Sequence, residues 1–145
     1  MNTKASLLVL ATALVATPMI ASAEVTTFQL RLSGDQEVPG PGDPDGQASG
    51  TLSIDDATGQ ITWSLSYSGI ATPAAMHIHT GAAGAGGGVA VPLNVETTGG
   101  DGTLIGSTMA DPAALAPILA APSGFYVNVH NADFRGGAIR GQLQN

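Results

Sequence analysis

Strict alternation of apolar and hydroxyl side chains between residues 61 and 68 is the feature that most limits how this chain can fold. The apolar residues of this segment and the hydroxyl residues between them are Ile61, Trp63, Leu65 and Tyr67, and Thr62, Ser64, Ser66 and Ser68. Successive side chains of an extended strand point to opposite faces, so this segment has one apolar and one polar face. The pattern predicts an antiparallel strand that is buried on one side.

Six further segments show the same two-residue period, and turn-forming residues separate them. They lie within residues 28–32, 48–54, 76–79, 89–95, 125–130 and 139–143. The intervening stretches 39–46, 55–59, 81–88 and 97–102 are rich in Gly, Pro, Asp and Thr. Seven or eight short strands with such turns predict an all-β fold, an antiparallel β-sandwich or a flattened barrel.

One short helix is expected between Asp111 and Ala120. Asp111 is a good N-cap and Pro112 suits the first helical position. Pro117 lacks the amide hydrogen that a longer helix would need, so the helix should be short or distorted.

The first 23 residues are expected to form a secretory signal peptide. Lys4 precedes an apolar run over residues 5–15, and the small residues at 21–23 are typical of a cleavage site before Glu24. We expect the mature part, residues 24–145, to be a single domain in the periplasm or outside the cell, with no membrane insertion. Cysteine is absent, so burial of apolar surface must stabilise the domain without disulfides.

The charge of the mature part argues against nucleic acid as a partner. Three arginines remain against eleven acidic residues, a net charge of about −8, and no basic cluster is present. The acidic balance is compatible with a cation ligand, although it is also common for solubility alone.

All three histidines lie in two of the predicted strands. His77 and His79 share one strand face because they are two residues apart, and His130 shares a face with Tyr126 and Asn128. If the two strands are close in one sheet, the three imidazoles converge. Three neutral imidazoles with an open fourth position suit copper or zinc.

Several motifs, taken in order, resemble those of the CHRD domain, a module named from chordin and found in secreted bacterial proteins. The segments that carry the resemblance are Leu32-Ser33-Gly34, Gln36-Glu37-Val38-Pro39, His77-Ile78-His79, residues 124–130 (GFYVNVH) and residues 137–143 (GAIRGQL). Ala138 stands where the family commonly has glutamate, and Asn131 where threonine is common. The resemblance implies an immunoglobulin-like or superoxide-dismutase-like β fold and a binding role that is not defined.

Two interpretations of these residues stay open. In the first, the chain is an exported, non-catalytic binding module with a copper or zinc site at His77, His79 and His130, and with Glu37, Asn128 and Arg140 as supporting groups or an ion pair. In the second, it is a structural or protein-interaction module without metal, in which the imidazoles only form hydrogen bonds. No nucleophile with a matching base is visible, so we do not expect an enzyme.

Overall fold

The computed structural model describes residues 24–95 and 102–144. The expected signal peptide, residues 1–23, lies outside the described residues. The strands are β1 (Val25–Ser33), β2 (Gln47–Asp55), β3 (Gln60–Ser68), β4 (Ala75–Thr80), β5 (Val89–Leu93), β6 (Thr103–Met109), β7 (Phe125–His130) and β8 (Ile139–Gln142). The helix is α1 (Pro112–Ala120), and two 3-10 turns cover Gly34–Gln36 and Pro122–Gly124.

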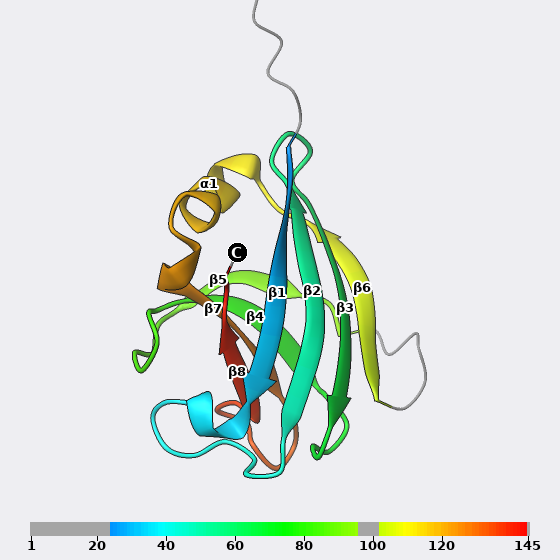
Figure 1. Ribbon diagram of the computed structural model, residues 1–145, viewed down its shortest axis with the longest axis vertical. Helices are drawn as coiled ribbons and strands as arrows, with labels where there is room; N and C mark the ends of the chain where they lie inside the picture. Colours follow the sequence, from blue (N-terminus) through cyan, green and yellow to red (C-terminus); the bar gives the residue numbers. More distant parts are fainter. Residues whose placement is uncertain (1–23, 96–101, 145) are drawn as a thin grey trace, which may run out of the picture.

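All eight strands belong to one sheet, in the order β5-β4-β7-β8-β1-β2-β3-β6, and every neighbouring pair is antiparallel. Strands β1, β2, β3 and β6 form one half, and β5, β4, β7 and β8 form the other half behind it (Figure 1). The halves meet where Ser33 of β1 pairs with Arg140 of β8. The sheet is therefore nearly closed, and the prediction of an all-β fold with one short helix is confirmed.

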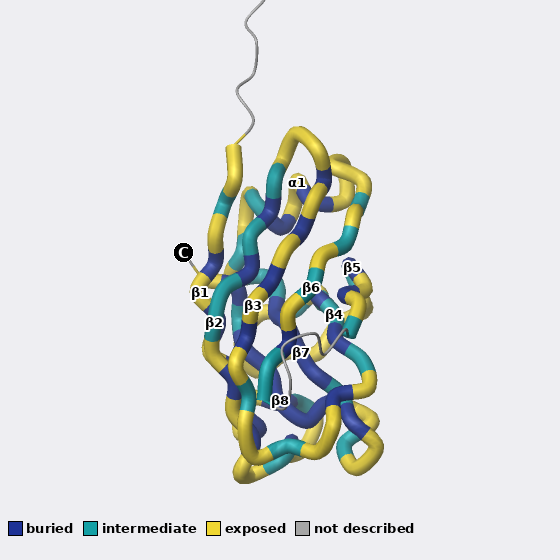
Figure 2. Tube along the Cα trace, turned by 90° about the vertical axis from the view of Figure 1, so that its right-hand side faces the viewer, coloured by how far each residue is buried: buried dark blue, intermediate teal, exposed yellow. Residues whose placement is uncertain are grey.

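The core lies between the two halves of the sheet. In β3 the exposed and buried residues alternate, as the stripe of residues 61–68 predicts, and Ile61, Trp63 and Leu65 are buried. Buried and exposed positions also alternate along neighbouring strands in Figure 2. From the other half, Met76, Ile78, Val127 and Val129 join the same apolar cluster.

Helix α1 lies at the end of the sheet where β1 begins (Figure 1). Asp111 caps it as predicted, because its carboxylate accepts a hydrogen bond of 2.8 Å from the amide of Ala113. Leu115 and Ile118 point into the core and are fully buried. No helix in residues 24–95 and 102–144 is long and apolar enough to cross a membrane.

Strand β6 is an element that the sequence pattern did not reveal. Leu104 is its only buried large apolar residue, while Ile105 and Met109 are exposed, so the strand lacks a clear apolar row. It is held by pairing with β3, where Gly106 lies opposite Trp63. The indole occupies the space beside this glycine, since a Cβ added at Gly106 would lie 2.5 Å from Trp63 Cζ2.

We predict that Gly106→Ala lowers the free energy of unfolding by about 1–3 kcal/mol, because the added methyl group displaces a packed indole. Urea unfolding followed by the fluorescence of Trp63, the only tryptophan of the chain, measures the change. Gly88→Ala is the matched control, because no atom lies within 4 Å of its added Cβ. Equal stability of both variants would show that the packing of the Trp63 indole does not depend on glycine at position 106.

Candidate metal centre

The pairing of β4 with β7 determines which side chains share the polar face. His77 lies opposite Asn128 and His79 opposite Tyr126, in an antiparallel ladder that runs from Ala75 to Thr80. The alternate residues of β4, Met76 and Ile78, are fully buried in the core. Met76 is thus a core residue, as its strand parity predicts, and it does not reach the histidines.

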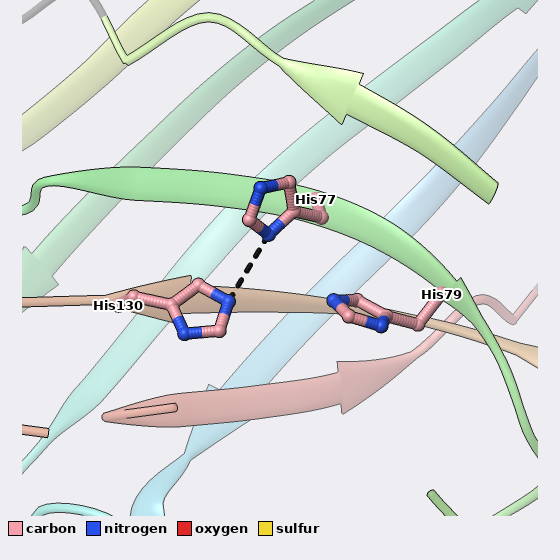
Figure 3. A group of neighbouring side chains, drawn as sticks. All are labelled: His77, His79 and His130. Atoms are coloured by element: carbon pink, nitrogen blue, oxygen red, sulfur yellow. Dashed lines mark hydrogen bonds between the residues drawn. The ribbon is translucent and has the colours of Figure 1, made fainter. Parts of the chain in front are cut away.

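The three imidazoles meet on this face, as the sequence predicted (Figure 3). The Nδ1 atom of His77 lies 3.1 Å from Nε2 of His130. One nitrogen from each of the three rings lies within 4.8 Å of the others. His79 lies beside the hydrogen-bonded pair of His77 and His130. Its ring centroid is 5.4 Å from that of His77 and 6.2 Å from that of His130.

Backbone carbonyl groups orient two of the rings. His79 Nδ1 lies 3.0 Å from the carbonyl oxygen of Gly87, and His130 Nδ1 lies 3.0 Å from that of Arg135. A carbonyl oxygen only accepts hydrogen bonds, so each Nδ1 carries the hydrogen and each Nε2 keeps a lone pair. Histidines that bind metals are usually oriented in this way.

The protonation of the rings also favours a role as ligands. Burial lowers the pKa of His77 and His130, and the neighbouring imidazoles lower these pKa values further. The hydrogen bond to the Arg135 carbonyl acts in the opposite direction on the pKa of His130. Both rings are therefore neutral at pH 7, the form in which imidazole coordinates a metal.

The geometry fits a three-imidazole site with an open position. Nitrogens around a zinc ion stand roughly 3.3 Å apart, because Zn–N bonds are about 2.0–2.1 Å long, and the contact between His77 and His130 is already close to this. Nε2 of His79 is buried and has no hydrogen-bond partner among the described residues. A buried lone pair without a partner is costly, and a metal ion would satisfy it.

Glu37 is buried beside this face, with 7% of its surface exposed. Its carboxylate rests against the backbone of Gly137, where a Cβ atom would overlap both of its oxygens. Burial raises the pKa of Glu37 to about 7, although the positive charge of Arg140 and a hydrogen bond with the Asn128 side chain lower it. Glu37 Oε1 and Asn128 Oδ1 are both buried acceptors without partners, so a proton on the carboxyl would supply a missing donor.

Arg140 is 1% exposed, and its hydrogen bonds are formed with groups other than Glu37. Its Nη2 donates, at 2.9 Å each, to the carbonyl oxygens of Ala82 and Ala85 and to Oε1 of Gln142. Its Nη1 is buried and has no partner. Arg140 therefore acts on Glu37 through space, and no hydrogen bond joins the two in the described part of the chain.

Sequence reasoning missed two features of the site. Tyr126 was placed on the correct face, but its stacking was not foreseen: its ring lies 5.0 Å from that of His79 at an interplanar angle of 7°. The segment 81–88 is predicted only as a turn between strands, yet its carbonyls accept hydrogen bonds from His79 and Arg140. Strand parity is the only sequence signal for Tyr126, and no sequence signal identifies an accepting carbonyl.

Comparison with known proteins gives a family and no individual relative. Residues 28–143 match the family model of the CHRD domain. No curated protein and no solved structure matches the chain.

We predict that Glu37→Gln stabilises the protein above neutral pH. The pKa of Glu37 is about 7 in the folded state and 4.5 in the reference state. The folded chain thus keeps a proton that the unfolded chain has lost, and stability falls as pH rises from 4.5 to about 7. Relative to wild type, the variant should gain about 2 to 3 kcal/mol between pH 5 and pH 8 in urea unfolding.

Glu24→Gln removes the same charge from an exposed position and serves as the control. It should show no gain. The lowered pKa values of His77 and His130 act with the opposite sign, because they make stability fall as pH drops below 6.5. This slope is common to wild type and variant, so it cancels in their difference. A difference that does not change with pH would contradict the buried, protonated Glu37.

Proposed function

We propose that this chain, which belongs to the CHRD domain family, is an exported, non-catalytic binding module whose three histidines hold copper or zinc. The observation that carries this proposal is the buried Nε2 of His79, which has no partner while Nδ1 of the same ring donates to Gly87. A histidine that served only as a hydrogen bonder would use both of its nitrogens when buried.

The ligand set would consist of Nδ1 of His77, Nε2 of His79 and Nε2 of His130. Uptake of a metal would require His77 to move its hydrogen from Nδ1 to Nε2, since its Nδ1 donates to His130 without metal. Imidazole nitrogen suits both copper and zinc, and the three rings leave a coordination position open.

Export and the absence of catalysis are parts of this proposal that the sequence supports. The pattern of residues 1–23 is that of a secretory signal peptide, which would place the mature domain in the periplasm or outside the cell. The buried charges, Glu37 and Arg140, are held by backbone and amide groups in the way that supporting residues are.

One observation favours a second function, a structural or protein-interaction module without metal. The hydrogen bond of 3.1 Å between His77 and His130 gives each ring a partner from another strand. The hydrogen bond between these rings therefore also links β4 to β7. This link would stabilise the domain with or without an ion.

His79→Ala separates the two functions. If the histidines bind metal, the variant should lose uptake of copper and zinc while the stability of the metal-free protein changes by less than about 1 kcal/mol. Chelator-stripped wild type should gain about 2.7 kcal/mol in stability at a hundredfold excess of metal over its dissociation constant. Calorimetric titration and metal-dependent melting measure these effects.

Thr80→Ala, on the same strand and exposed, is the control and should bind metal like wild type. If wild type binds neither ion and His79→Ala costs 1–3 kcal/mol in the metal-free state, the metal proposal fails and the structural module is supported.

A further inference from the structure

We infer that the three-histidine centre selects copper(I) over divalent ions, because Arg140 fixes a positive charge beside it. This inference rests on the metal site proposed above and concerns which ion it takes.

A stack of three side chains brings the charge close to the site. The Tyr126 ring lies parallel to that of His79, and Arg140 Cζ lies 3.4 Å from the Tyr126 centroid. β4 and β8 flank β7 on opposite sides, so His79 and Arg140 approach Tyr126 from different strands. The two contacts keep the guanidinium within about 8 Å of the His79 ring, a separation at which charges in a protein still interact strongly.

Within residues 24–95 and 102–144 no carboxylate forms a hydrogen bond with Arg140, which carries a permanent positive charge. A guanidinium stays protonated at every pH at which proteins fold. The hydrogen bonds of its Nη2 end on two carbonyls and an amide oxygen, which are neutral acceptors. Its solvent exposure is 1%, so water screens it weakly.

The ligands do not compensate this charge, because all three are imidazoles. Repulsion from Arg140 is twice as large for a divalent ion as for a monovalent one. An ion bound to Nε2 of His79 would lie beyond that ring, up to roughly 12 Å from the guanidinium. At this separation and an effective dielectric constant of about 20, the second charge costs a further factor of about ten in affinity. Imidazole nitrogen suits copper, and copper(I) carries a single positive charge, so the charge of Arg140 should favour copper(I) over zinc and copper(II) at this site.

The negative charge of Glu37 partly offsets the positive charge of Arg140. Glu37 therefore offers a second way to change the preference of the site for copper(I) over zinc. The positive charge of Arg140 lowers the pKa of the Glu37 carboxyl, so the two groups interact electrostatically. Removing the carboxylate leaves Arg140 less compensated and should make the preference for copper(I) stronger. Removing the guanidinium should make it weaker.

The test is the ratio of zinc to copper(I) dissociation constants at pH 8, from competition with chromophoric chelators, with copper kept reduced under anaerobic conditions. Arg140→Gln should lower this ratio about tenfold, and Glu37→Gln should raise it. Arg31→Gln removes an exposed arginine from β1 and should leave the ratio unchanged. Glu37→Gln decides the test alone if Arg140→Gln does not fold.

The outcomes distinguish this inference from the proposed function. If wild type binds neither ion, both are wrong. If wild type binds both ions but prefers zinc, or if neither variant shifts the ratio relative to Arg31→Gln, the metal site stands and the role of Arg140 is overturned.

Discussion

The antiparallel register between β4 and β7 is the constraint on which the polar side of the sheet depends. Met76 faces Val129 and Ile78 faces Val127, and all four are fully buried. A slip by one residue would turn these side chains to solvent and the histidines into the core, at a cost of several apolar burials. Burial of the apolar side chains thus fixes the register that brings the imidazoles together, although these apolar side chains are not ligands themselves.

Backbone groups then decide how the polar side chains on that face are oriented. Loops at opposite ends of the antiparallel β4–β7 pair present carbonyl oxygens, from Gly87 to His79 and from Arg135 to His130. Arg140 is held in the same way by residues of the 81–88 segment. His79 and His130 therefore each have one nitrogen fixed by the main chain, while His77 is oriented by its hydrogen bond with His130. Main-chain carbonyls can orient a ring with less loss of conformational freedom than flexible side chains would.

Much of this arrangement follows from strand parity, which is why the sequence predicts it. Alternation places the apolar rows and assigns the three histidines to one kind of face, while the capping preference of Asp111 and the position of Pro112 predict where the helix begins. It fails at β6, where Gly106 takes the place of an apolar side chain because the Trp63 ring fills the space. It also fails for contacts that involve main-chain carbonyls or rings stacked across strands, since no residue type encodes them.

The contact between Glu37 and Gly137 has a consequence for how relatives of this chain vary. The backbone at residue 137 touches the carboxylate so closely that any side chain there would occupy the same space. A larger residue at 137 therefore requires both a shorter residue at 37 and a different backbone conformation, because Gly137 has a φ of +139°. Homologous chains with a long side chain at position 37 should therefore keep glycine at 137, and a family alignment can be searched for this pairing without any structure.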